Sequence, residues 1–199
     1  MDDRERVLVD VWDWPTRVLH WLNAIIIIAL IALILGAEWM EELGVARELR
    51  RPVKEAHACL GHLFMVTLTL RIIWGFIGNK YARFSDIVPL KGWQWQAIGH
   101  NMKWYLSGFK GSAAKAIGHD PFAAIFYTLL FIVLISQALT GMLLSGAEFN
   151  TFPGTLFTGG MSEEALEGLE EALEGPHEAG FLFIIFFIAA HLIGLIAHE

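Results

Sequence analysis

The sequence predicts an all-α membrane protein, folded as an antiparallel four-helix transmembrane bundle. Of its 199 residues, 55% are hydrophobic and 18% are charged, whereas soluble domains carry about 25% charged residues. Four stretches of apolar residues are each long enough to cross roughly 30 Å of hydrocarbon as a helix. These stretches lack the strict alternation of apolar and polar residues that is typical of membrane β-barrels. Helices are therefore expected, because lipid offers backbone groups no external partner.

Charge and cysteine content exclude several classes of protein. The formal net charge is −7 at pH 7, so nucleic acid is not expected as a partner. Cys59 is the single cysteine, which rules out an internal disulfide and the Cys-x-x-Cys-His motif that attaches haem covalently. The mean hydropathy of +0.51 indicates that membrane lipid is the main surrounding of the chain.

The first two predicted spans cover residues 18–37 and 56–78. The tail before the first span carries the acidic residues Asp2, Asp3, Glu5, Asp10 and Asp13 against the basic residues Arg4, Arg6 and Arg17. This charge is wrong for a secretory signal peptide, and the apolar run that follows is too long for one. We therefore expect the first span to be a retained helix.

A loop over residues 79–120 is expected between the second span and the third, which covers residues 122–147. The loop holds Trp93, Trp95, Trp104 and Tyr105 among basic residues. Aromatic and basic side chains favour the headgroup region of a membrane. The loop is therefore expected to contain a short interfacial helix.

Residues 148–176 are predicted to form an acidic loop, and the fourth span covers residues 179–197. Within the loop, residues 162–175 place apolar side chains at helical spacing. Glu163 and Glu164 stand in the first turn, where the helix dipole favours negative charge. Two interpretations stay open for this segment: a solvated amphipathic cap on the bundle, or an acidic docking face for a cationic partner outside the membrane.

The basic residues of the loops predict the orientation of the chain. Placing the N-terminus inside the cell gives nine basic residues on that side and four on the other. Because cytoplasmic loops carry the excess of Lys and Arg, both termini are expected in the cytoplasm. The acidic loop over residues 148–176 is then extracytoplasmic.

Five of the eight histidines lie in or next to the predicted spans, where an ionisable residue is a functional candidate. The other three, His100, His119 and His198, are expected to be solvated or interfacial. His177 and His191 are fourteen residues apart, which on a helix corresponds to roughly 21 Å of rise and about 40° of net rotation. The fourth helix therefore presents two imidazoles on one side, one near each membrane face.

Other histidines lie at the matching depths. His20 is placed near the cytoplasmic face, at the depth of His191, and His57 is placed near the outer face, at the depth of His177. Two imidazoles that converge from different helices suit the axial positions of a haem iron in a four-helix bundle. A structural zinc site would need four ligands. The pattern thus favours two stacked, non-covalent b-type haems, with the four histidines as ligands of the two irons.

His62 competes with His57 for the role of ligand. It lies about 140° around the helix and roughly 7 Å deeper than His57, so both cannot face one haem. We favour His57 because it matches the depth of His177. In addition, Gly61 stands one turn below His57, where the absence of a side chain admits the macrocycle.

Two arginines are candidate partners of haem propionates. Arg71 lies fourteen residues after His57 on nearly the same face, and Arg17 lies three residues before His20. A charge within the membrane needs a counter-ion, which a propionate would supply. The alternative is that both guanidinium groups extend to lipid phosphates.

A series of short motifs runs in order along nearly the whole chain. The motifs are Val11-Trp12-Asp13-Trp14-Pro15-Thr16-Arg17-Val18-Leu19-His20-Trp21, His57-x-x-x-Gly61, Arg71-Ile72-Ile73-Trp74-Gly75, Tyr81-Ala82-Arg83-Phe84, Gly118-His119-Asp120-Pro121, Gln137-Ala138-Leu139-Thr140-Gly141, His177-Glu178 and His191. Together they resemble the prokaryotic cytochrome b561-like family, which includes the di-haem subunits of membrane-bound nickel–iron hydrogenases. The resemblance implies a four-helix electron-transfer protein of the bacterial cytoplasmic membrane, with two b haems held by His20, His57, His177 and His191.

The resemblance also implies the class of partner. Members of the family pass electrons between a quinone pool and a periplasmic donor or acceptor. This chain ends directly after the fourth predicted span, and its acidic loop is similar to that of short members that serve c-type cytochromes. The expected partners are therefore a quinone and either a periplasmic c-type cytochrome or the membrane-anchored subunit of an oxidoreductase.

Two other functions are weighed against the electron-transfer hypothesis. A histidine-based metal transporter would need carboxylates or thiols beside the histidines, and the predicted spans offer only Cys59. A haem-free membrane anchor, recruiting a soluble subunit through the acidic loop, would leave the matching depths of the histidines to coincidence.

Overall fold

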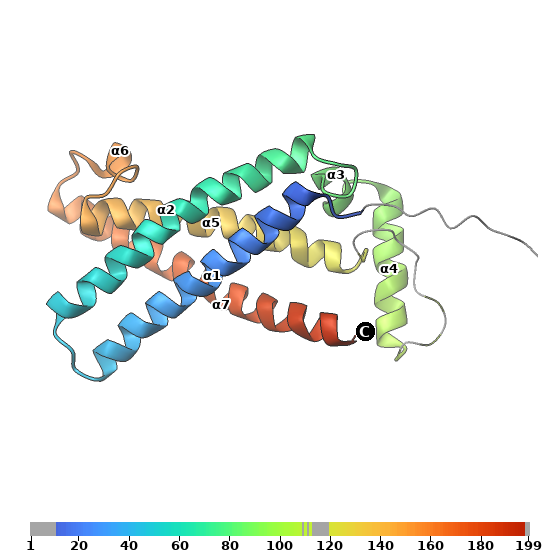
Figure 1. Ribbon diagram of the computed structural model, residues 1–199, viewed down its shortest axis with the longest axis horizontal. Helices are drawn as coiled ribbons and strands as arrows, with labels where there is room; N and C mark the ends of the chain where they lie inside the picture. Colours follow the sequence, from blue (N-terminus) through green and yellow to red (C-terminus); the bar gives the residue numbers. More distant parts are fainter. Residues whose placement is uncertain (1–10, 109, 111, 113–119, 198–199) are drawn as a thin grey trace, which may run out of the picture. The chain divides into compact units, whose positions relative to one another are not determined.

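The computed structural model describes residues 11–108, 110, 112 and 120–197, which form seven α-helices and no strand (Figure 1). The helices are α1 (Trp14–Glu42), α2 (Arg47–Ile77), α3 (Phe84–Ile87), α4 (Gly92–Leu106), α5 (Ala123–Phe149), α6 (Thr155–Thr158) and α7 (Glu163–Ala197). Of these, α1, α2, α5 and α7 are long and apolar enough to cross a membrane. The predicted all-α membrane fold with four spanning helices is confirmed.

Local hydrogen bonds define both ends of α1, and a short turn joins its second end to α2. Asp13 caps the start of α1, because its Oδ1 accepts a hydrogen bond from the Thr16 backbone N–H at 3.0 Å. At the other end of α1, Gly44 has a φ of 71°, and the N–H groups of Gly44 and Val45 donate to the carbonyls of Glu41 and Met40. This pair of bonds is a Schellman motif, which ends a helix at a left-handed glycine.

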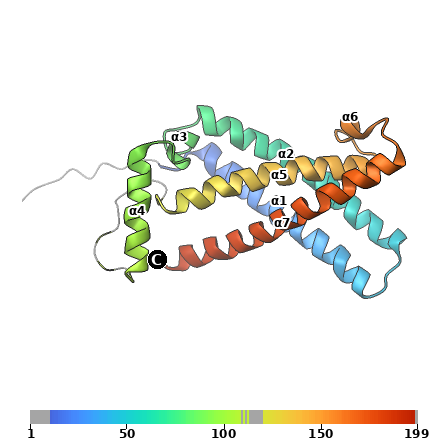
Figure 2. The ribbon, with the colours of Figure 1, turned by 180° about the vertical axis from the view of Figure 1, so that it is seen from behind.

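The segment 148–176, expected to be a loop, is largely helical in the structure. It contains the last residues of α5, the short helix α6 and the first residues of α7, which is one continuous helix in Figure 2. Pro176 lies inside this helix. The prediction of helical spacing over residues 162–175 therefore described the start of the fourth helix rather than a separate one. Proline removes one backbone donor from a helix, and the remaining hydrogen bonds hold the two halves together.

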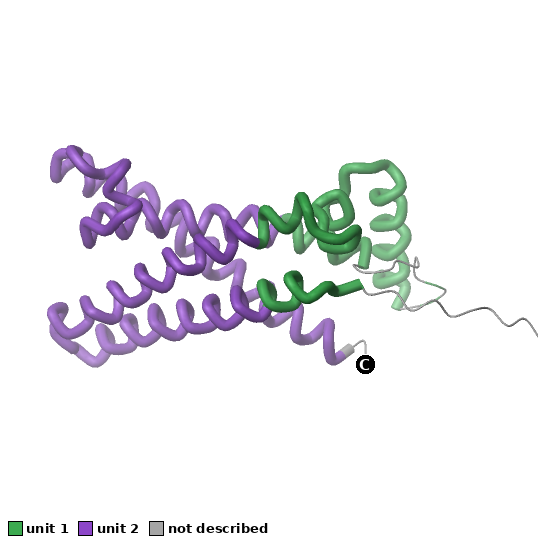
Figure 3. Tube along the Cα trace, turned by 45° about the horizontal axis from the view of Figure 1, so that its top comes forward, with its two compact units in different colours: residues 1–20, 71–128 green, residues 21–70, 129–199 purple. Residues whose placement is uncertain are grey.

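The chain divides into two compact units, coloured separately in Figure 3: Met1–His20 with Arg71–Thr128, and Trp21–Leu70 with Leu129–Glu199. The second unit, here called the bundle unit, contains most of α1, α2, α5 and α7. Its buried apolar side chains include Ile26, Phe64, Leu134 and Ile184. Within it, the Thr67 hydroxyl donates to Asn23 Oδ1 at 2.8 Å, a polar contact between α2 and α1 of the kind that joins membrane helices.

The first unit, here called the loop unit, contains α3, α4 and the ends of three long helices. The α4 helix is the short helix expected within residues 79–120. The Asn101 side chain is fully buried and donates to Asp120 Oδ2 at 2.8 Å. Asp120 Oδ1 in turn accepts hydrogen bonds from the N–H groups of Phe122 and Ala123, so Asp120 fixes the start of α5 next to α4.

Candidate functional site

Two of the predicted ligand histidines face each other inside the bundle unit. His57 on α2 and His177 on α7 have their ring centroids 6.5 Å apart, with the ring planes at 78°. They come from helices that are far apart in the sequence but pack together in this unit. The structure thus brings together the pair that was expected at one depth of the bundle.

A backbone carbonyl orients the His57 ring. His57 Nδ1 lies 3.0 Å from the carbonyl oxygen of Leu30 on α1. Because a carbonyl can only accept, Nδ1 is the protonated nitrogen, and Nε2 keeps its lone pair. This is the arrangement in which a metal-binding histidine is held, since the second nitrogen fixes the tautomer and the direction of the ring.

A side chain plays the same part for His177. His177 Nδ1 lies 2.8 Å from Thr140 Oγ1, and Thr140 Oγ1 lies 2.8 Å from the Ser136 carbonyl, to which the hydroxyl donates. The hydroxyl oxygen therefore accepts from His177 Nδ1–H, which again leaves Nε2 with a lone pair. Gln137 Nε2 donates to the His177 carbonyl at 2.7 Å and so attaches the same turn of α7 to α5.

Sequence reasoning gave no individual role to Gln137 or Thr140, although both belong to a quoted motif. The signal that could have found them is their polarity: they stand one turn apart in an otherwise apolar span, where polar groups are rare and need partners.

Two glycines complete the contact between α5 and α7 around His177. A side chain at Gly180 would collide with that of Gln137, and a Cβ at Gly141 would lie 3.2 Å from His177 Cε1.

The two rings line a cavity of about 410 Å³ within the bundle unit, within the range of roughly 300–1,000 Å³ that is typical of ligand pockets. Most of its lining is apolar and includes Leu30, Phe64 and Ile184. Gly61 also lines it, and a Cβ built at Gly61 would meet nothing within 4 Å. The space that Gly61 leaves open is therefore available to a bound group.

The geometry of the pair fits a haem. Imidazole nitrogens bind a metal at about 2 Å, so two imidazoles on opposite sides of one iron place their ring centroids about 6 Å apart. The observed separation of 6.5 Å is close to this value. Two oriented histidines, an apolar cavity and an open glycine are together suited to a b-type haem with two axial imidazoles.

His62 lines the same cavity but has a different partner. Its Nε2 lies 3.2 Å from Ser145 Oγ. Because the Ser145 hydroxyl donates to the Met142 carbonyl at 2.9 Å, its oxygen accepts from His62 Nε2–H. Nε2 of His62 is thus protonated and hydrogen-bonded, whereas Nε2 of His57 keeps its lone pair. This difference favours His57 as the ligand.

The other predicted pair lies in two different units. His20 is on the part of α1 that belongs to the loop unit, and His191 is on α7 in the bundle unit, where its ring stacks on Phe187 with 6.0 Å between centroids. Their pairing stays a prediction. Of the remaining histidines, His100 is near the Ser112 carbonyl at 2.8 Å, and His119 and His198 lie outside the described residues.

The two arginines predicted to contact propionates both bind backbone carbonyls in the loop unit. Arg71 donates to the Ala82 carbonyl at 3.2 Å, and its guanidinium lies 5.9 Å from the centre of the Phe84 ring. Arg17 Nε donates to the Trp12 carbonyl at 2.7 Å. A contact of either arginine with a propionate stays a prediction.

No group of three or more His, Cys, Asp or Glu side chains within the described ranges is arranged to hold a metal ion. His57 and His177 offer two imidazoles, and a pair of imidazoles suits a metal whose remaining ligands come from a cofactor, as the macrocycle nitrogens do in haem.

Comparison with known proteins gives a matching family model and several relatives. The family model described as prokaryotic cytochrome b561 matches residues 11–199. A probable Ni/Fe-hydrogenase B-type cytochrome subunit of Azotobacter vinelandii is 26% identical over 198 residues, which cover 95% of this chain and 80% of the relative. The corresponding protein of Rhizobium leguminosarum bv. viciae is 30% identical over 196 residues, covering 94% of this chain and 80% of the relative.

A third relative is the probable Ni/Fe-hydrogenase 1 B-type cytochrome subunit of Escherichia coli K12. It is 32% identical over 140 residues, which cover 67% of this chain and 59% of the relative. No solved structure gives a significant match to the chain.

Proposed function

The chain belongs to the prokaryotic cytochrome b561 family of membrane electron-transfer proteins that bind haem b, and from this premise we propose that it carries electrons across the membrane through two haems. Each haem is held by two histidines from different helices. The observation that carries the proposal is the geometry of His57 and His177, whose rings are 6.5 Å apart and line one cavity.

The residues that would hold the first haem are His57 and His177. The hydrogen bonds to the Leu30 carbonyl and the Thr140 hydroxyl support this assignment, because they leave Nε2 of both rings able to bind iron. His20 and His191 bind the second haem, as the fourteen-residue separation of His177 and His191 and the family motifs support. Gly61 leaves space for the first macrocycle, and Arg17 and Arg71 are the candidate propionate partners.

The bound haem supplies a one-electron couple, and the protein residues determine its surroundings. A haem held by two histidines would favour electron transfer over binding of oxygen. Apolar side chains make up most of the cavity lining, and Leu30 and Thr140 hold the histidine rings in fixed orientations. These residues therefore adjust the stability of the oxidised and reduced forms without acting as acids or bases.

The names of the relatives support an oxidoreductase as the partner, since they describe subunits of Ni/Fe-hydrogenases. We place the protein in the bacterial cytoplasmic membrane with both termini in the cytoplasm. It exchanges electrons with a quinone and with a periplasmic protein, either the membrane-anchored subunit of an oxidoreductase or a c-type cytochrome. The excess of basic residues in the loops expected to be cytoplasmic supports this orientation.

The proposal is tested by the haem content of the purified full-length protein. We expect two b haems per chain by pyridine haemochrome assay, and low-spin spectra that carbon monoxide does not change. His177→Ala and His57→Ala should each lose one haem, whereas His62→Ala and the control His100→Ala should keep two.

One outcome would overturn the proposal, and another would change the ligand assigned on α2. Folded protein made with haem available but containing none would overturn the proposal and favour the metal-transport or anchor hypotheses. Loss of a haem in His62→Ala with retention in His57→Ala would reassign the ligand on α2.

A further inference from the structure

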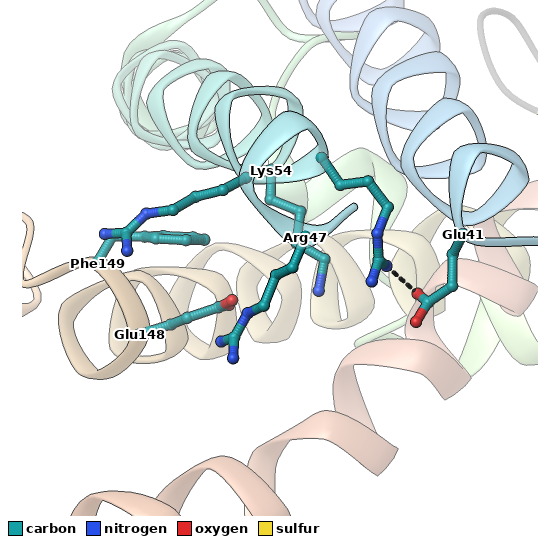
Figure 4. Close-up of a pocket in the computed structure, with 7 residues that line it drawn as sticks. Glu41, Arg47, Lys54, Glu148 and Phe149 are labelled. Carbon is teal, nitrogen blue, oxygen red and sulfur yellow. Dashed lines mark ion pairs between the residues drawn. The ribbon is translucent and has the colours of Figure 1, made fainter. Parts of the chain in front are cut away.

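A second cavity, of about 310 Å³, adjoins the histidine cavity in the bundle unit (Figure 4). It lies among the end of α1, the start of α2 and the end of α5. Its lining residues are Glu41, Arg47, Arg50, Arg51, Lys54, Glu148 and Phe149. Four basic side chains from one end of α2 therefore gather beside two glutamates.

The three arginines of this cavity are attracted to carboxylates of the protein itself. Arg50 forms an ion pair with Glu41, drawn as the dashed line in Figure 4. Arg51 forms one with Glu55 at 2.8 Å, and its guanidinium lies 5.9 Å from the centre of the Phe149 ring. Arg47 is attracted electrostatically by Glu170.

Lys54 differs from the arginines in two respects. Within the described part of the chain, it has neither an ion pair nor a hydrogen bond from its side chain. It also lines both cavities, and it is the single Lys or Arg among the residues that line the histidine cavity. Its ammonium group is thus the cation available to a negatively charged group in the histidine cavity.

The position of Lys54 on α2 agrees with this role. It precedes His57 by three residues, so the two side chains share one face of the helix about one turn apart. Arg17 precedes His20 by the same three residues. A cation therefore stands one turn before the α1 and α2 histidines assigned to the two haems.

The charges around the histidine cavity favour such a cation. The lining of the cavity also includes four glutamates, namely Glu38, Glu148, Glu174 and Glu178. A b-type haem carries two carboxylates on one edge, and glutamates beside that edge would repel them. The favourable direction for the carboxylates is the basic start of α2, where Lys54 can donate a charge-assisted hydrogen bond.

We propose that the ammonium group of Lys54 binds a carboxylate of the haem held by His57 and His177, and thereby fixes the direction in which that haem enters its cavity. This inference rests on the proposed function, because it requires a haem between these two histidines. It adds a binding residue for that haem at the start of α2.

The test compares haem with its dimethyl ester, which has no carboxylate to pair. Full-length wild-type protein, Lys54→Gln, Lys54→Arg and the control Arg51→Gln are each loaded with either group. Release is then followed by transfer to an excess of a haem-scavenging apoprotein. Lys54→Gln should release one of its two haems, the one held by His57 and His177, about tenfold faster than the wild type releases it, since a charged hydrogen bond is lost.

The dimethyl ester should leave the wild type and Lys54→Gln at the same rate. Lys54→Arg and Arg51→Gln should behave as the wild type with both groups. The proposal is overturned if Lys54→Gln releases haem at the wild-type rate, or if it accelerates release of haem and ester equally. Either result would concern Lys54 alone and would leave the proposed function intact, because the wild type would still bind two haems. A wild type that binds no haem would contradict the proposed function itself.

Discussion

The two histidines that line the cavity of the bundle unit are oriented by different kinds of group. His57 donates to the main-chain carbonyl of Leu30, and His177 donates to the side chain of Thr140. The sequence could predict the histidines, because imidazoles at helical spacing in apolar spans stand out. It could not predict the Leu30 carbonyl, since every residue carries one and only packing decides which carbonyl meets a ring.

Replacing Thr140 tests the hydrogen bond to His177. Thr140→Val keeps the shape but removes the acceptor, which leaves a half-buried imidazole N–H unbonded at a cost of about 1–3 kcal/mol. As the proposed iron ligand, His177 would then be less basic, so the oxidised haem would be less stabilised and its midpoint potential should rise. Redox titration followed in the visible spectrum measures the change.

Thr140→Ser is the matched control, because it keeps the hydroxyl and should retain the wild-type potential. If the valine and serine variants have the same potential and haem content, the hydroxyl does not act on the ligand.

Asp13 makes the loop unit sensitive to acid. Burial by itself raises the pKa of Asp13, but hydrogen bonds from Thr16, Trp74 and Asn79 outweigh this effect and lower the pKa below its ordinary value. A carboxyl group with a lowered pKa in the folded state stabilises the fold above its unfolded pKa of about 3.9. That stabilisation is lost as the pH falls through the folded pKa.

Asp13→Ala should therefore unfold more easily than the wild type at pH 7, by about 1 kcal/mol for the lost helix cap. The difference should shrink as the pH falls through the pKa of Asp13. Thermal unfolding in detergent at pH 7 and at successively lower pH measures it, with Asp13→Asn as the variant that keeps the capping oxygen. A difference that does not vary with pH would assign the effect to shape rather than charge.

At the scale of whole elements, the predicted spans are shorter than the helices that contain them. The second span was placed at residues 56–78, whereas α2 begins at Arg47, and the fourth was placed at 179–197, whereas α7 begins at Glu163. Apolarity marks the part of a helix that lipid surrounds. It does not mark charged turns that continue the same helix, nor does it show that Pro176 is accommodated within α7.

The acidic half of α7 allows a test of the two interpretations of this segment. The glutamates concerned are Glu163, Glu164, Glu167, Glu170, Glu171 and Glu174. If they form a docking face for a basic c-type cytochrome, changing them to glutamine should slow association at low salt and have little effect at high salt. Stopped-flow reduction of the cytochrome measures the rate.

Glu48→Gln on α2 serves as the control for the loss of one carboxylate outside this segment, and it should leave the association rate nearly unchanged. Equal rates for the wild type and the α7 variant at low ionic strength would identify the segment as a solvated cap.

For the whole molecule, the fold class, the four spanning helices and the family followed from the sequence. The depth argument placed His57 and His177 at one level because helical rise fixes the height of a side chain along its own helix, and their rings lie 6.5 Å apart in the structure. It could not specify Lys54, whose proposed role depends on which side chains line the cavity rather than on the pattern along one helix.

The unequal anchoring of the two histidines has a consequence for how such a protein can diverge. A main-chain carbonyl persists through almost any substitution, so a change of side chain at position 30 leaves the hydrogen bond to His57 in place. The Thr140 hydroxyl can be gained, shortened or lost by a single codon change that leaves the helix intact. Position 140 is thus a place where related chains can change the hydrogen bond to one histidine while both histidines stay the same.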